Sequence, residues 1–294
     1  MSKLDFYIVD VFAKGKYTGN PLAVVVNASS LSDEQMQQIA QEMNYSETTF
    51  ILSEGSSSDG YDVRIFTPKE ELPFAGHPTL GTAYVIQKML VGEPVEKLVL
   101  NLKVGKIPVT WEKSEVEELL WMQQNPPTFM QTFSANVLAD ILNLRESDIE
   151  SGFPIQEVST GIPFILVPLK TKAALKQIKV SLDSYYKLIQ TTQAKGILVF
   201  CPETESPENQ LSVRMFADAL GIPEDPATGS ANGCLAGYLV KHSYFGNNEI
   251  RVRVEQGAEM NRPSLLFLNA SQAAESIQVS VGGKVILVAK GELL

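Results

Sequence analysis

The apolar residues of this 294-residue chain fall in short segments, many of them alternating with polar residues, and turn residues separate the segments. Segments 5–12 and 22–26 are rich in β-branched and aromatic residues, which predicts two strands. Gly15, Gly19 and Pro21 lie between them, so we expect a hairpin with a long, glycine-bearing loop. Further strands are predicted at 44–52, 61–66, 97–104, 106–111, 119–122 and 196–200, with two more across 156–167, and a solvated loop is predicted at 55–60.

Five helices are predicted from the residues at their N-termini. Ser32 and Gln35 form a capping-box pattern, and apolar residues follow at helical spacing through Met43. In Gly76-His77-Pro78 we expect His77 to be the N-cap and Pro78 the first helical residue, with the helix reaching about Met89. Further helices are predicted to begin at Ser134, at Leu182 and at Gly229.

The second half of the chain repeats the order of the first. Arg-Ile-Phe at 64–66 is followed 150 positions later by Arg-Met-Phe at 214–216, and Gly76 is followed 153 positions later by Gly229. We therefore predict a duplicated αβ unit with pseudo-two-fold symmetry. A competing alignment places His77 on Asp225, 148 positions later. We prefer the glycine alignment because it gives both helices the same starting point.

The break at Asn125-Pro126-Pro127 predicts a domain boundary, and the length suffices for two domains. We expect an N-terminal half at 1–126, completed by the C-terminal strand at about 279–294, and a C-terminal half at 127–278.

Composition narrows the classes of partner. The chain has 24 basic and 34 acidic residues, a formal net charge of -10, and no cluster of Lys or Arg stands out. Nucleic acids and anionic membranes are therefore not expected partners. No apolar run approaches the ~20 residues of a spanning helix, and the N-terminus lacks a signal-peptide core, so we expect a cytoplasmic protein.

Metal chemistry is not expected either. The two cysteines, Cys201 and Cys234, have no metal-ligand spacing and are interpreted as small packing residues. The only histidines are His77 and His242, too few for a multi-histidine site.

The two glycine-led helices provide the first candidate site. Free N–H groups and a partial positive charge at a helix N-terminus suit an anion, so Gly76 and Gly229 together could bind one carboxylate. His77 and Asp225 add titratable groups beside them. Each observation also has a structural interpretation: two ordinary capped helices, a structural histidine, and an aspartate that favours a turn.

Glu47 is the third candidate because the residues around it are uncharged. Partial burial would favour the protonated form of its carboxyl group and suit it to carry a proton. A solvated glutamate at a strand end is the alternative interpretation.

Several motifs together resemble the PhzF family of phenazine-biosynthesis isomerase-like proteins, and the similarity covers essentially the whole chain. They are Val11-Phe12, Gly19-Asn20-Pro21-Leu22-Ala23-Val24, Ser46-Glu47-Thr48-Thr49-Phe50, Phe66-Thr67-Pro68, Glu71 to Thr79, and Glu224-Asp225-Pro226-Ala227-Thr228-Gly229-Ser230-Ala231. The resemblance implies an α+β, diaminopimelate-epimerase-like fold: two pseudo-symmetric domains, each with a curved, mostly antiparallel sheet around a central helix.

The resemblance also implies roles for residues. Gly76 and Gly229 stand where epimerases of that fold have cysteines, so two-thiol racemisation is not expected. Glu47 matches the family's catalytic glutamate, which moves a proton on a cyclic, carboxylate-bearing substrate in the inter-domain cleft. His77, Asp225 and Ser230 match residues that bind the substrate and assist the transfer. No metal or organic cofactor is implied, and a homodimer is expected.

The leading hypothesis is therefore an isomerase that shifts a double bond by proton transfer on a small carboxylate. A non-catalytic binding or adaptor protein of the same fold, or an epimerase or lyase using the same glutamate, remains an alternative. One departure bears on the substrate: Asn261 stands where the corresponding family segment usually has glycine.

Overall fold

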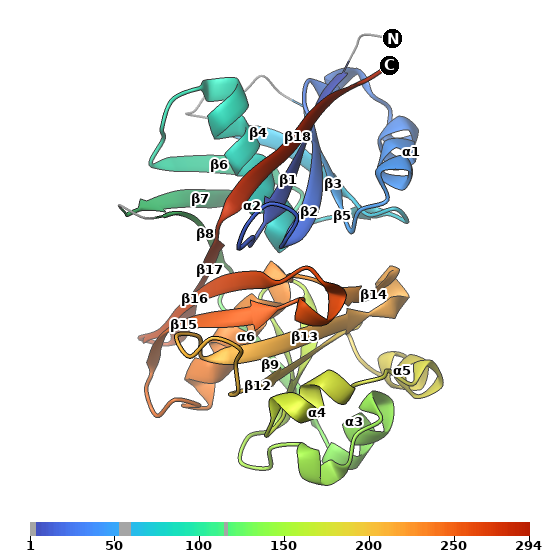
Figure 1. The fold of residues 1–294 in the computed structure, drawn as a ribbon, viewed down its shortest axis with the longest axis vertical. Helices are drawn as coiled ribbons and strands as arrows, with labels where there is room; N and C mark the ends of the chain where they lie inside the picture. Colours follow the sequence, from blue (N-terminus) through green and yellow to red (C-terminus); the bar gives the residue numbers. More distant parts are fainter. Residues whose placement is uncertain (1–3, 53–59, 115–116) are drawn as a thin grey trace. The chain divides into compact units, whose positions relative to one another are not determined.

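The computed structural model describes residues 4–52, 60–114 and 117–294, and the chain divides into two compact units. The first unit comprises residues 1–123 with 282–294, and the second comprises residues 124–281. Each unit has one central helix within a curved, mostly antiparallel sheet (Figure 1), so the predicted α+β architecture is confirmed. Most of the loop predicted at 55–60 lies outside the described residues.

The sheet of the first unit surrounds helix α2 (Gly76–Val85). Neighbouring strands are antiparallel except for the parallel pairs β2 with β3 and β4 with β6. The short strand β5 (Glu71–Leu72) pairs with β4. In hydrogen-bonding order the strands are β18 (Val285–Leu293), β1 (Leu4–Val11), β2 (Asn20–Val25), β3 (Thr48–Ile51), β4 (Tyr61–Phe66), β6 (Lys97–Leu102), β7 (Gly105–Lys113) and β8 (Glu118–Gln124).

Helix α1 (Asp33–Met43) packs on the other face of this sheet. Thr49 of β3 points toward α2, so Phe50 points to the opposite face, where it packs with Met36 and Ala40 of α1. Two short elements complete the unit: the 3-10 helix η1 (Ala28–Ser30) and the π-helical turn η2 (Ile86–Val91) that continues α2.

The second unit repeats this arrangement around helix α6 (Gly229–Lys241). Its parallel pairs are β11 with β12 and β13 with β15, and β14 (Ile222–Asp225) pairs with β13. In sheet order the strands are β9 (Thr128–Phe133), β10 (Ile155–Ser159), β11 (Pro163–Pro168), β12 (Gly196–Cys201), β13 (Leu211–Ala217), β15 (Glu249–Gln256), β16 (Ser264–Ala273) and β17 (Ser276–Gly283).

Three helices cover part of the second sheet, and one apolar cluster joins them to it. They are α3 (Ala135–Leu142), α4 (Lys172–Gln177) and α5 (Leu182–Ile189), and the 3-10 turns are η3 (Glu146–Asp148), η4 (Asp218–Leu220) and η5 (Ala258–Met260). The shared order of parallel and antiparallel pairs confirms the duplication. Both central helices begin at the aligned glycines, so the glycine alignment is correct and the alternative with His77 on Asp225 is wrong.

Small residues explain why these helices occupy the centre of each unit. All residues of α2 except Tyr84 are buried, and all residues of α6 except Lys241 are buried. A Cβ added at Gly81 would lie 2.6 Å from Leu22 Cδ2 and 2.9 Å from Val11 Cγ2. The sheet therefore approaches the helix more closely than a larger residue would allow.

Two predicted boundaries need correction. The N-cap of α2 is Ala75, so Gly76 and His77 are the first two helical residues and Pro78 the third; the prediction of His77 as cap was wrong. Proline is tolerated there because the first four helical N–H groups have no intrahelical partner. The strand predicted at 44–52 is shorter, because Asn44 is the left-handed C-cap of α1 and β3 begins at Thr48.

The repeated arginine motif forms the same ion pair in both units. Arg64 Nε and Nη2 donate to the carboxylate oxygens of Glu71 at 2.8 and 2.7 Å, and those of Arg214 donate to Glu224 at 2.7 and 2.8 Å. Each guanidinium also lies over the phenylalanine two residues further along its strand, 5.0 and 4.9 Å from the ring centroid. These pairs connect a central strand to the segment that leads into the central helix.

Gly81→Ala should lower the free energy of unfolding by about 1–3 kcal/mol, because the added methyl group overlaps Leu22 and Val11 in a packed interior. Urea unfolding measures this. Gly15→Ala is the control, because a Cβ there has no neighbour within 4 Å in the described residues. Equal effects of the two substitutions would contradict the packing argument.

Glu224→Gln should lower the free energy of unfolding by about 2–3 kcal/mol, because it leaves the guanidinium of Arg214, whose side chain is 9% exposed, without its charged partner. The exposed Glu249→Gln on β15 serves as control and should change stability by less than about 0.5 kcal/mol. If Glu224→Gln lowered the free energy of unfolding by less than about 0.5 kcal/mol, as expected for the control, the pair with Arg214 would not stabilise the fold.

Candidate functional site

Glu47 and His77 meet at the N-terminus of α2. Glu47 directly precedes β3, and its Oε2 lies 3.5 Å from Nε2 of His77. Two residues further along, the hydroxyl oxygens of Thr49 and Thr82 share a hydrogen bond of 2.8 Å between β3 and α2. Side chains two apart on a strand share a face, so the same face of this strand directs both Glu47 and Thr49 to the helix. Glu47 and His77 are 7% and 3% exposed, so the interpretation of Glu47 as a solvated residue is wrong.

His77 is neutral in the folded protein. Burial lowers its pKa to about 3, which outweighs the opposing effect of a hydrogen bond to the backbone of Pro21. Proline offers only its carbonyl, and Nε2 faces Glu47, so Nδ1–H donates to Pro21. The Nε2 of this tautomer carries a lone pair. Although 3.5 Å satisfies an ion-pair distance, a neutral imidazole is not a cation, so a hydrogen bond here requires the proton on Glu47.

The second helix N-terminus has a different set of side chains. Thr228 is the N-cap of α6, and its hydroxyl donates to Oδ2 of Asp225, the last residue of β14. Gly229 and Ser230 form the buried first turn of α6, and Asn232 Nδ2 donates to the carbonyl of Thr228 at 3.0 Å. The structure thus groups Asp225, Gly229 and Ser230 in the second unit, as it groups Glu47, Gly76 and His77 in the first.

The repeats differ at the position of the glutamate. When segments 64–66 and 214–216 are aligned, β3 pairs with β4 in the same register as β12 with β13, which makes Gly196 equivalent to Glu47. A Cβ at Gly196 would lie 2.6 Å from Cδ1 of Phe164, so that ring fills the adjacent space. The helix alignment likewise makes Ser230 equivalent to His77. The pair formed by Glu47 and His77 therefore belongs to one repeat.

Sequence reasoning missed Gln256, which is 2% exposed at the end of β15. Its Oε1 accepts from the N–H of Thr228 at 3.1 Å, and its Nε2 donates to the carbonyl of Asp225 at 2.8 Å. A signal existed: Ile250, Val252 and Val254 mark the buried face of this strand, and Gln256 continues it.

Gln124 was also missed. Its Nε2 donates to the carbonyl of Gly229 at 3.0 Å, and its Oε1 accepts from Thr160 at 2.6 Å. A Cβ at Gly233 would lie 1.9 Å from that Oε1, so the glycine makes room for this amide beneath the first turn of α6. The contact spans 105 positions of sequence and leaves no local pattern.

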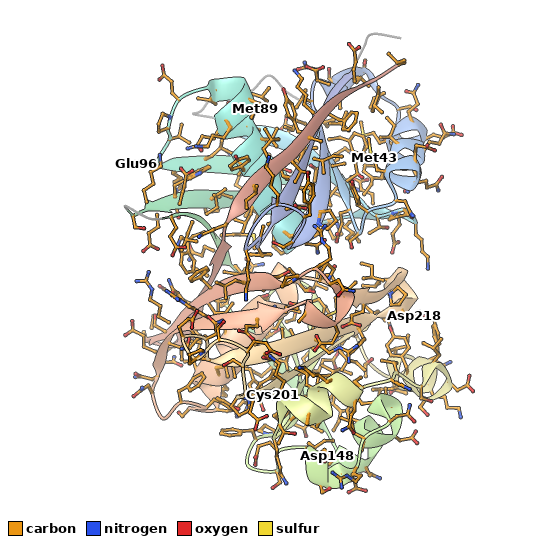
Figure 2. All side chains as sticks on the ribbon, in the orientation of Figure 1. Met43, Met89, Glu96, Asp148, Cys201 and Asp218 are labelled. Carbon is orange, nitrogen blue, oxygen red and sulfur yellow. The ribbon has the colours of Figure 1, made fainter. Side chains whose placement is uncertain are left out.

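Neither cysteine lies at a helix N-terminus. Burial raises the pKa of the Cys201 thiol, at the end of β12 (Figure 2), to about 11, and that of Cys234, within α6, to about 12. Both thiols therefore stay protonated, as expected for packing residues. Among the described residues, no group of three His, Cys, Asp or Glu side chains could bind a metal ion.

The departure at Asn261 has a backbone explanation. Asn261 ends η5 with φ 56° and ψ 27°, a left-handed conformation that asparagine adopts more readily than most residues and glycine adopts freely. The backbone conformation at position 261 therefore suits both asparagine and glycine.

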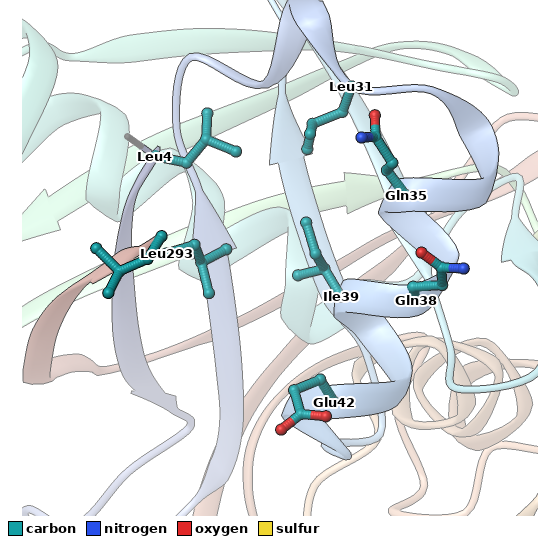
Figure 3. Close-up of a pocket in the computed structure, with 8 residues that line it drawn as sticks. Leu4, Leu31, Gln35, Gln38, Ile39, Glu42 and Leu293 are labelled. Carbon is teal, nitrogen blue, oxygen red and sulfur yellow. The ribbon is translucent and has the colours of Figure 1, made fainter. Parts of the chain in front are cut away.

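A groove of about 350 Å³ lies elsewhere in the first unit, between α1 and the ends of β1 and β18 (Figure 3). Apolar side chains, including Leu4, Ile39 and Leu293, line it, and Glu42 is the one charged side chain among the described residues that line it. An anionic substrate is disfavoured beside this carboxylate.

No helix in the described part of the chain is long and apolar enough to cross a membrane.

Comparison with known proteins agrees with this architecture. The model of the PhzC-PhzF family, described as phenazine biosynthesis-like protein, matches residues 9–291. An uncharacterized isomerase of Clostridium acetobutylicum is 33% identical, with 99% of this chain and 98% of the relative covered. The trans-2,3-dihydro-3-hydroxyanthranilate isomerase of Pseudomonas aeruginosa is 34% identical, with 97% and 98% covered.

Solved structures show the same fold. A PhzF-family protein from Bacillus anthracis superposes with a TM-score of 0.91 at 28% identity, covering 100% of both chains. A hydroxyproline epimerase from Agrobacterium vitis, at 9% identity, a TM-score of 0.65 and coverage of 99% and 92%, shares the fold alone. Since the family match and the 34% identical relative both extend over nearly the whole length, this chain belongs to the phenazine biosynthesis-like protein family and is an isomerase.

Proposed function

We propose that this isomerase shifts a double bond in a small, cyclic, carboxylate-bearing metabolite by cofactor-independent proton transfer, with Glu47 as the proton carrier. The observation that supports this most directly is the buried pair of Glu47 and neutral His77 at the N-terminus of α2. A carboxylate shielded from water can take a proton from one carbon of the substrate and return it to another, and the neutral imidazole lone pair beside it can accept a hydrogen bond from the carboxyl group while it carries the proton.

When Glu47 is protonated, Nε2 of His77 assists by accepting a hydrogen bond from the carboxyl group. Its ring is oriented by the Pro21 carbonyl, so Nε2 remains directed at the carboxyl group. The separation of 3.5 Å exceeds an ordinary hydrogen bond, and catalytic bonds of this kind commonly shorten when substrate binds.

Asp225, Gly229 and Ser230 are proposed to bind the same substrate. The first turns of α2 and α6 offer N–H groups to the substrate carboxylate and to the enolate-like charge that develops as the proton leaves. Glycines begin both helices, so no side chain at these positions stands between ligand and backbone. The name of the Pseudomonas aeruginosa relative makes trans-2,3-dihydro-3-hydroxyanthranilate the first compound to test.

The state of His77 predicts how stability depends on pH. The unfolded chain takes up a proton on this histidine below its ordinary pKa of 6.5, whereas the folded protein does not until about pH 3. Its neutral form therefore contributes fully above pH 6.5, and stability falls by up to about 1.4 kcal/mol per pH unit as the pH drops through this window. Urea unfolding at pH 7, 6 and 5 should show a shallower dependence for His77→Gln.

His242→Gln is the matched control. Burial also lowers the pKa of His242, but this ring is only partly buried, so its removal should flatten the pH dependence less. If His77→Gln left the pH dependence unchanged, the histidine would not be held neutral by the fold.

Glu47→Gln should abolish proton transfer, because an amide cannot carry the proton. In heavy water, the parent should incorporate deuterium into trans-2,3-dihydro-3-hydroxyanthranilate as it isomerises, and the variant should be slower by about 100-fold or more. Mass spectrometry measures both rates. Glu34→Gln, on the exposed side of α1, should behave as the parent. Deuterium incorporation at the parent rate in Glu47→Gln would show that Glu47 is not the proton carrier.

A further inference from the structure

Gln256 uses both ends of its side-chain amide. Oε1 accepts from Thr228 N–H at 3.1 Å and from Asn232 Nδ2 at 3.0 Å. Nε2 donates to the Asp225 carbonyl at 2.8 Å and to the Thr228 hydroxyl at 3.1 Å. Four hydrogen bonds satisfy the two lone pairs and two N–H groups of a carboxamide, so this one has a single orientation.

Main-chain partners fix that orientation. The Thr228 N–H can only donate and the Asp225 carbonyl can only accept, so the oxygen of Gln256 must face the first and its nitrogen the second. The Thr228 hydroxyl receives a hydrogen from Nε2, which leaves its own hydrogen for Oδ2 of Asp225. A directed path therefore runs from the Gln256 amide through the Thr228 hydroxyl to the Asp225 carboxylate.

The residues on either side hold Gln256 in place. The carboxylate of Glu255 accepts from the N–H groups of Glu205 and Ser206 at 2.8 and 3.0 Å and from Asn209 Nδ2 at 2.7 Å. Gly257 has φ 78°, and a Cβ there would lie 2.5 Å from the carbonyl oxygen of Pro226. Strand β15 is thereby attached to one loop before Gln256 and to the segment following Asp225 after it.

We propose that Gln256 is a positioning residue for the reaction: through the Thr228 hydroxyl it orients the carboxylate of Asp225, and through the Thr228 N–H it fixes the start of α6. The inference rests on the proposed function in that it gives Asp225 a part in the chemistry. Gln256 itself touches Asp225 and Thr228, and it acts on the substrate only through them.

Two variants test the path. Gln256→Met keeps the length of the side chain and removes all four hydrogen bonds, whereas Thr228→Val keeps the shape and the N–H of residue 228 and removes only the hydroxyl. Each should lower kcat on trans-2,3-dihydro-3-hydroxyanthranilate by about tenfold or more, with KM changed less than about threefold. The exposed Gln272→Met on β16 is the control and should behave as the parent.

The double variant separates positioning from general damage. Both substitutions interrupt one path, so together they should lower kcat no more than about twofold beyond the worse single variant. Losses that multiply, or a Gln256→Met enzyme within about twofold of the parent, would overturn the proposal. If Gln256→Met does not fold, Thr228→Val alone tests the proposal, and a kcat of Thr228→Val equal to that of the parent would overturn it.

A measurement without substrate distinguishes this inference from the proposed function. The hydroxyl proton of Thr228, shielded and bonded to a carboxylate, should give a slowly exchanging proton resonance that Thr228→Val assigns by its loss. Gln256→Met should abolish the resonance and Gln272→Met should keep it. Its persistence in Gln256→Met would reject the positioning role, whereas failure of the parent to exchange deuterium rejects the proposed function and leaves this result standing.

Discussion

A helix with no polar face must be covered on every side, and this requirement determines the architecture of both units. Because α2 and α6 are buried along their length, the sheet of each unit must curve around its helix. Their N-terminal N–H groups have no intrahelical partner. The same packing that removes the helix from water thus concentrates hydrogen-bond donors at one end, where the candidate site residues lie.

The two repeats share the Arg–Glu ion pairs but differ in the side chains beside the helix N-terminus. The Arg–Glu pairs have nearly identical geometry in both repeats, and they hold the segment that leads into each central helix. At the equivalent positions nearest the helix N-terminus, Glu47 and His77 of one repeat correspond to Gly196 and Ser230 of the other. The contacts that the repeats share are those that shape the backbone, and the positions at which they differ are those of the proposed proton carrier and its histidine partner.

Sequence reasoning reached the parts of this structure that depend on local pattern or on the internal repeat. The glycines at 76 and 229 located both helix starts, and the arginine motif located the strands before them. The cap of α2 was misplaced because proline suits any position in a first turn, so Pro78 did not mark the first residue. Gln124 left no local pattern. The alternation of β15 marked Gln256 as buried, but its partners come from a distant segment that only the folded chain brings close.

The phenylalanine ring beside Gly196 has a stereochemical consequence. It fills the space that a side chain at position 196, the equivalent of Glu47, would need. Under the proposed mechanism one carrier both takes and returns the proton, so departure and return occur on the same face of the substrate ring. Enzymes with two opposed carriers invert a centre, whereas a single carrier yields a suprafacial shift. The packing of Phe164 against Gly196 bears on that course because it leaves Glu47 without a counterpart in the second repeat.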